Sequence, residues 1–175
     1  MRGMQEQFVI EGLGGERTLA GTLAVNGSKN EALKIYAASL LFASPLTVTN
    51  VPDIEDMKRM GELLEDLGVR VEQTALRTFR LSPPKAPKHH PSDALFRRLR
   101  ASIVLVGPLL ARCGEVTFVF PGGCSIGRRP IDIFLDGFRN MGATIASEED
   151  AECTTFTLRG KLKGADIFEK IPSVT

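Results

Sequence analysis

Hydrophobic positions along the chain recur at two spacings, one helical and one alternating. The run from Glu31 to Ala43 is rich in Ala and Leu and lacks a breaker, so it predicts a helix with Ser28 at its N-cap. Between Asp53 and Gly68 apolar residues recur at helical spacing, which predicts a second helix, capped by Asp53 and ended by Gly68. Shorter apolar or alternating stretches predict strands at Phe8–Ile10, Thr18–Val25, Leu46–Thr49, Val69–Glu72, Arg77–Leu81, Val116–Phe120, Ala143–Ala146 and Thr154–Leu158.

Two further helices are expected in the second half of the chain. One should start at Ser92 or Asp93, after a proline-rich loop, and should be kinked or divided at Pro108. The other should begin at Pro130, which suits the first helical position, and end at Gly142. Strands and helices that alternate in this way predict an α/β protein.

An internal repeat is visible in the order of these elements. A strand, a glycine-containing turn and a helix occur over residues 19–43 and again over residues 116–141. A helix that ends in Leu67-Gly68-Val69 or in Met141-Gly142-Ala143 then leads into a strand. Residues 160–175 resemble the start of a third unit, so we expect the chain to be part of a larger domain.

Composition narrows the class of protein. The 175 residues are 43% hydrophobic and 25% charged with a net charge of +1, which is typical of a globular protein and gives no indication of a nucleic-acid or membrane partner. No apolar run is long enough for a bilayer, and the first residues lack a signal-peptide pattern. Three cysteines without framework spacing favour a cytoplasmic protein, and no Cys/His cluster has metal spacing, so no metal or cofactor is expected.

Residues 121–130 form the most distinctive loop, Pro-Gly-Gly-Cys-Ser-Ile-Gly-Arg-Arg-Pro. Glycines free the backbone amides to approach a ligand, and Arg128 and Arg129 add positive charge at a predicted helix start. Such surroundings attract an anion and lower the pKa of a cysteine, here Cys124. The alternative is a glycine turn with a half-buried cysteine and solvated arginines. Without such surroundings, Cys113 and Cys153 are expected to be packing thiols.

Lys29 and Arg100 are the other candidate anion ligands. Lys29 lies at a predicted helix start, where a cation opposes the helix dipole, and this conflict favours a functional role. Because the turn at Lys29 and the 121–130 loop hold corresponding places in the predicted repeat, their cations could converge on one anionic ligand. The alternatives are a solvated Lys29, a surface Arg100 and an Asn30 that only caps the helix.

Three segments carry a family resemblance in this order: Gly27-Ser28-Lys29-Asn30, residues 99–112 and residues 121–130. They resemble the UDP-N-acetylglucosamine 1-carboxyvinyltransferase family over nearly the whole chain. The sister family of the shikimate pathway shares the fold and the Gly-Ser-Lys start, but it normally lacks the Pro-Gly-Gly-Cys loop and the Asn after the Lys.

The resemblance implies an inside-out α/β barrel lobe of repeated βαβαββ units, here incomplete. Residues 1–20 would form an N-terminal strand and turn that pack with a missing lobe, and residues 21–175 would hold two units and the start of a third. The implied reaction moves the enolpyruvyl group of phosphoenolpyruvate to the 3′-hydroxyl of UDP-N-acetylglucosamine and releases phosphate, with no metal required. This is the first committed step of peptidoglycan synthesis. The resemblance implies no nucleic-acid or membrane partner, and a missing C-terminal part or self-association is expected to cover the exposed faces.

The resemblance also assigns roles to residues. Cys124 would be the general acid at the phosphoenolpyruvate methylene and the residue alkylated by fosfomycin. Lys29 and Asn30 would contact phosphoenolpyruvate, and Arg100 and Arg129 would hold anionic groups. The residues assigned to the nucleotide sugar are Arg129, Pro130, Ile131, Asp132, Ile133, Ile171, Pro172, Ser173 and Val174.

Some features depart from the family pattern. The family's general-base Asp and a further Arg have no counterpart in these 175 residues. Arg128 stands where a small residue is commoner, and Thr175 stands where Gly is usual. Two alternatives to a partial enzyme therefore remain: a truncated, non-catalytic module that binds the UDP-sugar or phosphoenolpyruvate, and a fold fragment without a ligand that pairs with another copy.

Overall fold

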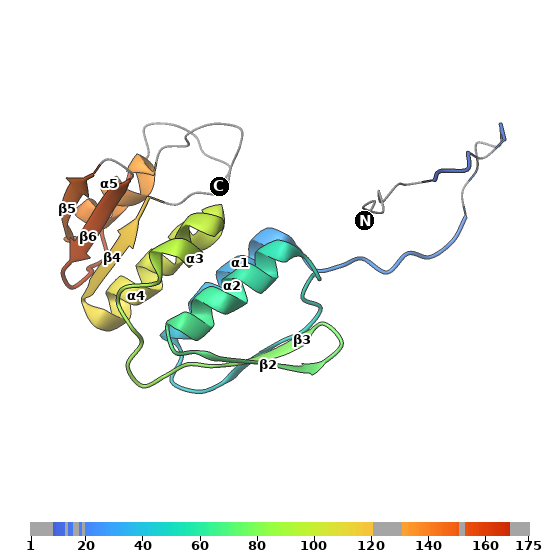
Figure 1. The fold of residues 1–175 in the computed structure, drawn as a ribbon, viewed down its shortest axis with the longest axis horizontal. Helices are drawn as coiled ribbons and strands as arrows, with labels where there is room; N and C mark the ends of the chain where they lie inside the picture. The colour runs from blue at the N-terminus through green and yellow to red at the C-terminus, as the bar shows by residue number, and fades with distance from the viewer. Residues whose placement is uncertain are drawn as a thin grey trace, which may run out of the picture.

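The computed structural model describes residues 9–12, 14–15, 18, 20–120, 131–150 and 153–168. Within these residues, two three-stranded antiparallel sheets lie on either side of a group of packed helices (Figure 1). The elements are α1 (Lys29–Ala38), η1 (Ser39–Leu41), β1 (Leu46–Val48), α2 (Glu55–Asp66), β2 (Arg70–Ala75), β3 (Thr78–Ser82), α3 (Asp93–Arg98), η2 (Arg100–Leu105), α4 (Val106–Cys113), β4 (Glu115–Val119), α5 (Asp132–Asn140), β5 (Thr144–Glu149) and β6 (Thr154–Arg159).

The first two helices form largely as their patterns predict. Ser28 caps α1, because its Oγ accepts a hydrogen bond from the Glu31 N–H (3.4 Å). The expected cap of α2 was wrong. Ile54 occupies that position without a side-chain bond, while Asp53 lies 3.5 Å from the Lys58 Nζ. The apolar stripe of α2 is buried, as its helical spacing predicts: Met57, Met60, Leu63 and Leu64.

The helix expected after Ser92 is divided at Leu99 and not at Pro108. Leu99 has extended backbone angles (φ −133°, ψ 118°), so α3 ends there and η2 follows. Pro108 lies in the first turn of α4, where a backbone N–H has no partner within the helix. The ring therefore removes no hydrogen bond and does not kink the helix.

Two copies of one strand–helix–hairpin unit make up most of the fold. The first copy, β1–α2–β2–β3, has the strand order β1-β3-β2, and the second, β4–α5–β5–β6, has the order β4-β6-β5. Both helices end at a glycine with a left-handed φ of 95°, Gly68 and Gly142, as the sequence predicts. In both copies the N–H of the residue after that glycine returns to a helix carbonyl, from Val69 to Leu64 and from Ala143 to Phe138 (2.9 Å each).

This arrangement corrects the repeat expected from the sequence. The 121–130 loop lies between β4 and α5, so its counterpart is the loop between β1 and α2 and not the turn before α1. The strand expected at Thr18–Val25 is absent from the described residues, where the chain is extended and Leu23 and Val25 are exposed. Phe8 lies outside the described residues, and the adjoining Val9 and Ile10 are exposed and form no strand.

A single apolar core joins the two copies through the helix layer. Leu81 and Leu158 lie near the ends of β3 and β6, the central strands of the two sheets, and both are fully buried. The Phe118 ring lies between the rings of Phe96 and Phe156, with centroid distances of 5.5 and 5.6 Å. The remaining strands and turns were predicted to within a few residues.

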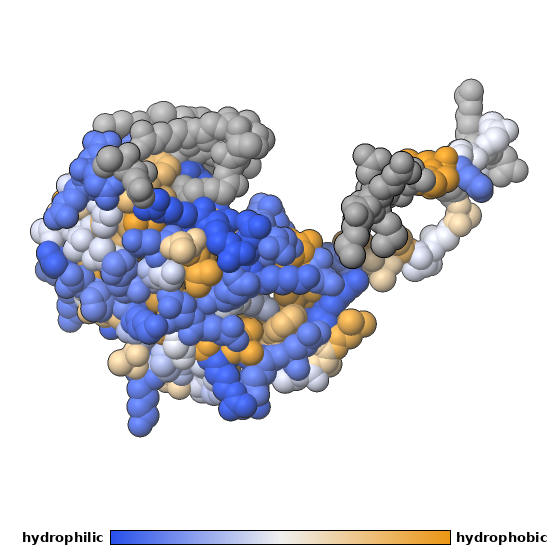
Figure 2. Space-filling view, in the orientation of Figure 1, coloured by the Kyte–Doolittle hydropathy of each residue, from blue (hydrophilic) through white to orange (hydrophobic). Residues whose placement is uncertain are grey.

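The outer edges of the two sheets differ. The Thr117 N–H on β4 donates to the His89 carbonyl (3.1 Å), so a backbone segment covers that edge. Among the described residues, β1 has no backbone hydrogen bond except those with β3. The N-terminal arm of residues 20–26 extends away from the body (Figure 1), and hydrophobic residues lie along it, whereas the visible face of the body is mostly hydrophilic (Figure 2).

The described residues do not close into a barrel, which agrees with one incomplete lobe. Residues 161–168, where a third unit was expected to begin, contain no helix or strand. None of the helices seen in the described part of the chain combines the length and the hydropathy that a bilayer crossing requires.

Arg112 of α4 ties together loops that are far apart in the sequence. Its Nη1 donates to the Leu40 carbonyl (2.5 Å), and its Nη2 donates to the carbonyls of Pro84 (3.1 Å) and Lys85 (2.9 Å). The Leu40 carbonyl belongs to η1, and the other two belong to the proline-rich loop. Among the described residues, these carbonyls accept no helix or sheet hydrogen bond that would replace the bonds from Arg112. A planar guanidinium can serve both loops at once because its donors point in fixed directions.

The turn before α1 approaches the loop after β1 very closely. A Cβ added at Gly27 would lie 2.1 Å from the Asn50 carbonyl oxygen, so only glycine fits. Asn50 itself has a left-handed φ of 54°, and its Nδ2 donates to the Val25 carbonyl (3.5 Å). Arg77 lies in the β2–β3 turn, and its Nη1 donates a hydrogen bond to Asn26 Oδ1. The start of α1 is thereby fixed against the end of β1.

We expect Arg112→Ala to lower the free energy of unfolding by about 2–3 kcal/mol, because it leaves these loop carbonyls without a charged donor. Arg80→Ala is the matched control, since Arg80 is an exposed arginine of β3 whose change should stay within about 0.5 kcal/mol. Urea unfolding followed by circular dichroism measures both. Equal stability of the two variants would contradict the role of Arg112.

We also expect Gly27→Ala to destabilise the chain by about 1–3 kcal/mol, since the added methyl group must displace the Asn50 backbone. Gly21→Ala is the control, because a Cβ there meets no atom within 4 Å. Thermal unfolding of both variants tests this expectation, and a Gly27→Ala variant as stable as Gly21→Ala would refute it.

Candidate functional site

Lys29 is the first residue of α1 and is paired across to the next helix. Its Nζ lies 3.0 Å from Asp56 Oδ2, and the two side chains are 52% and 34% exposed. Asp56 lies in the first turn of α2. The N-terminal ends of two helices therefore meet at this ion pair. Asn30 follows in the same turn and is exposed, so its amide is open to a ligand.

Arg100 begins η2 and lies beside the chain that enters the 121–130 loop. Its guanidinium carbon is 5.8 Å from the centroid of the Phe120 ring, a cation–π distance. The Phe120 N–H donates to the Thr154 carbonyl (2.8 Å), which fixes Phe120 at the end of β4. Arg100 is thus half-buried and held at the start of the cysteine loop.

Contacts between helix ends link the two cations. The segment η2 packs against α1. Arg59 Nη1 donates to the Arg98 carbonyl at the end of α3 (2.7 Å), while Arg59 Nε donates to Glu55 Oε1 (3.0 Å). The end of α3 therefore lies with the starts of α1 and α2, at the same end of the helix layer (Figure 1). Lys29 belongs to α1 and Arg100 to η2, and both residues lie at this end of the helix layer.

The repeat places these two cations at matching points. Lys29 opens the helical segment that precedes β1, and Arg100 opens the helical segment η2–α4 that precedes β4. This corrects the expectation that Lys29 corresponds to Arg128 and Arg129. The counterpart of Lys29 in the second unit is the start of η2, where Arg100 lies.

Some of the expected site residues lie outside the described part of the chain: Cys124, Arg128, Arg129, Pro130 and Ile171–Val174. Ile131, Asp132 and Ile133 are described at the start of α5. The Ile131 side chain is buried in the core, so a ligand there would meet its backbone. Asp132 is exposed in the first turn, and Ile133 is partly exposed.

The two described cysteines differ in their surroundings. Burial raises the pKa of the Cys113 thiol, an effect that the neighbouring Arg112 charge opposes. The Cys113 Sγ also lies 3.6 Å from the Pro87 carbonyl. Cys153 lies in the turn before β6, with its N–H donating to Asp150 Oδ1 (2.8 Å). Cys113 is thus a half-buried packing thiol, as its sequence context predicts.

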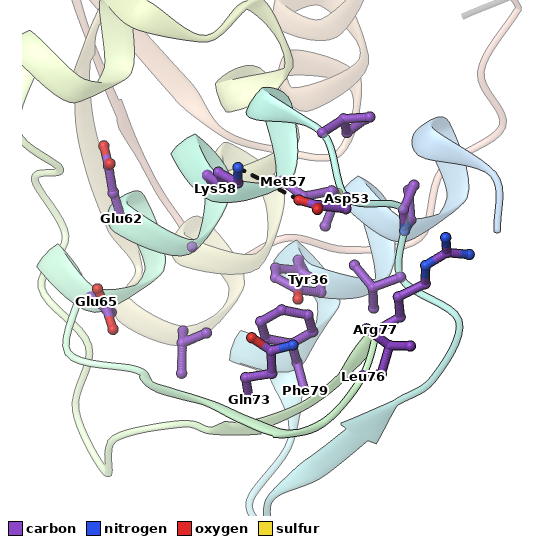
Figure 3. A pocket seen from close by; sticks show the side chains of 15 residues that line it. Tyr36, Asp53, Met57, Lys58, Glu62, Glu65, Gln73, Leu76, Arg77 and Phe79 are labelled. Carbon is purple, nitrogen blue, oxygen red and sulfur yellow. Dashed lines mark ion pairs between the residues drawn. The ribbon is translucent and has the colours of Figure 1, made fainter. Parts of the chain in front are cut away.

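A hollow of about 490 Å³ lies elsewhere, between α2 and the β2–β3 hairpin (Figure 3). Tyr36 and Phe79 form part of its floor with their rings edge to face at 6.2 Å, and burial raises the pKa of the Tyr36 phenol. Lys58 and Arg77 lie at its rim. Its lining does not include Lys29, Asn30 or Arg100, so it is separate from the cation-bearing end.

Sequence reasoning did not identify Asp56 or Phe120. Asp56 follows a normal pattern of acidic residues at a helix start, and nothing in the sequence indicates which cation it meets. Phe120 was assigned only to a strand. Among the described residues, no group of three or more His, Cys, Asp and Glu side chains could hold a metal ion.

Comparisons with known proteins agree with this architecture. Residues 13–175 match the family described as EPSP synthase (3-phosphoshikimate 1-carboxyvinyltransferase). The enolpyruvyl transferase NikO of Streptomyces tendae shares the fold, with a TM-score of 0.66 at 22% identity over 81% of this chain and 30% of that one. EPSP synthase of Acinetobacter baumannii gives a TM-score of 0.62 at 20% identity over 88% of this chain and 35% of that one.

Curated relatives are similar in sequence as well. The UDP-N-acetylglucosamine 1-carboxyvinyltransferase of Wolbachia pipientis subsp. Culex pipiens (strain wPip) is 43% identical over 89% of this chain, and that of Desulfosudis oleivorans (strain DSM 6200 / JCM 39069 / Hxd3) is 40% identical over 97%. The chain spans 38% and 39% of the length of these relatives. With a family match over most of its length and this fold, the chain belongs to the EPSP synthase (3-phosphoshikimate 1-carboxyvinyltransferase) family.

Proposed function

We propose that this chain carries part of the site of an enzyme that transfers the enolpyruvyl group of phosphoenolpyruvate to the 3′-hydroxyl of UDP-N-acetylglucosamine. The observation that carries the proposal is the gathering of Lys29 and Arg100, from separate helical segments, at one end of the helix layer. The names of the relatives at 40–43% identity support this choice of substrates. The proposal includes a role in peptidoglycan synthesis in the cytoplasm, which the family resemblance of the sequence motifs implies.

The charges suit a substrate with phosphate and carboxylate groups. Lys29 provides a compact positive charge near the free amides of the α1 N-terminus, and Asn30 adds an amide beside it. Arg100 provides a planar fork of donors, held by the Phe120 ring. Together they would bind phosphoenolpyruvate and stabilise the negative charge that develops on the leaving phosphate.

The proposed reaction has two steps. In the addition, the 3′-oxygen of the sugar would bond to C2 of phosphoenolpyruvate and its hydroxyl proton would pass to a general base outside these 175 residues. The Cys124 thiol would give a proton to C3, so a tetrahedral intermediate would form. In the elimination, the C2–O bond to phosphate would break with departure of phosphate, and C3 would return a proton to the Cys124 thiolate, which restores both the double bond and the thiol. Arg129 would hold the anionic groups, and Pro130–Ile133 with Ile171–Val174 would line the nucleotide sugar.

A second candidate is a chain that binds these ligands without turnover. The observation in its favour is that the chain spans 38% and 39% of the length of two curated relatives, so these 175 residues hold only part of the site that such a relative would have. Phosphate release in the presence of both substrates separates the two candidates. Binding of UDP-N-acetylglucosamine without phosphate release would select the second.

We expect Lys29→Ala to weaken phosphoenolpyruvate binding by about tenfold or more, because it removes a charge-assisted contact to the phosphate. Lys34→Ala is the matched control, since Lys34 is an exposed lysine on the same helix and its loss should change binding less than about twofold. Isothermal titration calorimetry of both variants measures the effect. Equal dissociation constants would exclude Lys29 from the site.

We expect fosfomycin to add covalently to Cys124 and to spare Cys113 and Cys153. Burial keeps the Cys113 thiol protonated to a higher pH than an ordinary cysteine, so its nucleophilic thiolate is scarce at neutral pH and grows only as the pH rises through the elevated pKa. Peptide mass spectrometry after treatment at pH 7 and pH 9 locates the adduct. Equal labelling of the three cysteines at pH 7 would show that Cys124 has no special reactivity.

A further inference from the structure

Asp56 is the acidic side chain that meets the candidate substrate lysine. The Lys29 Nζ lies 3.0 Å from Asp56 Oδ2, and the two residues come from the first turns of different helices. We propose that Asp56 is a positioning residue that holds the Lys29 ammonium close to the N-terminus of α1, where an anionic substrate would bind. This inference rests on the proposed function, in which Lys29 contacts phosphoenolpyruvate.

Stability of the fold does not account for this ion pair. Both side chains are partly exposed, and pairs of this kind contribute about 0–1 kcal/mol. The helices α1 and α2 are already held together by buried side chains of the apolar core, among them Leu33, Tyr36 and Met60. The pair therefore has little to add to packing, whereas it fixes the direction of a long, flexible side chain.

The pair also offsets an electrostatic conflict. A lysine in the first turn of α1 is repelled by the positive end of the helix dipole, and on its own its ammonium would turn towards solvent. A carboxylate in the first turn of α2 is favoured by that helix dipole and attracts the ammonium back. Asp56 thus keeps positive charge beside the free amides that an anion would use.

The ammonium remains available to a ligand while it is paired. A lysine ammonium has three N–H donors, and the contact with Asp56 Oδ2 uses one of them. The other donors can point to a phosphate or carboxylate oxygen. A short Asp side chain has few rotamers, so it defines the ammonium position more narrowly than a longer acid would.

Substitution of Asp56 distinguishes positioning from a simple charge effect, because the two have opposite signs. Removing a negative charge near an anion site strengthens anion binding if only the field matters. If Asp56 positions Lys29, Asp56→Asn should instead weaken phosphoenolpyruvate binding, by about fivefold. Asp56→Glu should recover most of the affinity. Calorimetric titration of the 175-residue chain with phosphoenolpyruvate at low salt measures all three proteins.

Asp53→Asn provides the matched control. Asp53 precedes the same helix and pairs with Lys58 (3.5 Å), so the variant makes the same change in charge without touching Lys29. Its affinity for phosphoenolpyruvate should equal or slightly exceed that of the wild type. Tighter or unchanged binding by Asp56→Asn, or an equal loss in Asp53→Asn, would overturn the proposal.

A measurement without substrate separates this inference from the proposed function. A short pulse of an acylating reagent followed by mass spectrometry should label Lys29 at least about threefold faster in Asp56→Asn than in the wild type, because the contact with Asp56 holds the nitrogen in place and limits its approach to the reagent. Lys58 should show the faster labelling in Asp53→Asn instead. If the wild type does not bind phosphoenolpyruvate, the proposed function fails for this chain. Equal Lys29 labelling in wild type and Asp56→Asn refutes the positioning role in either case.

Discussion

The close contact between Gly27 and Asn50 is the constraint on which the cation-bearing end of the molecule depends. It brings the turn before α1 within van der Waals reach of the loop after β1, where a side chain has no room. Asn50 adopts a left-handed conformation there, and its side-chain amide donates a hydrogen bond to the Val25 carbonyl. The Arg77 guanidinium donates to the side chain of Asn26, the residue before Gly27. Because α1 starts at this contact, the position of Lys29 follows from it.

Most of the remaining fold consists of two copies of one strand–helix–hairpin unit. In each copy a strand leads through a loop to a helix, the helix ends at a left-handed glycine, and a hairpin returns to pair with the first strand. The loop between the first strand and the helix differs in sequence between the two copies, whereas the left-handed glycine and the hairpin recur in both. In one copy this loop contacts Gly27, and in the other it contains the cysteine motif.

Local signals in the sequence predicted much of this architecture. Gly68 and Gly142 marked the helix ends because only glycine takes a left-handed φ at little cost. Pro108 misled, because a proline breaks a helix only when it lies beyond the first turn, and the sequence does not reveal where that turn begins. The repeat was assigned to the wrong segments because glycine-rich turns before helices look alike, and only strand pairing shows which ones correspond.

The candidate site was predictable in part for the same reason. Lys29, Asn30 and Arg100 lie in sequence motifs whose order along the chain is recognisable, so the sequence was enough to name them as candidate site residues. The ion pair of Lys29 with Asp56 joins positions 27 residues apart and depends on how two helices pack. Phe120 under Arg100 likewise depends on where β4 ends relative to η2. Pairings across elements of this kind carry no local pattern.

Among the described residues, the side of β1 away from β3 makes no backbone hydrogen bond, and this has a consequence for how the chain behaves in solution. Backbone groups along an exposed strand margin recruit any extended peptide that can reach them, whether from the same molecule or from a neighbour. The second sheet is guarded at the matching position by the carbonyl of His89. Among the described residues, the outer strands β2 and β5 also pair on one side only, so an added strand could join either sheet, and the His89 contact protects the β4 margin alone.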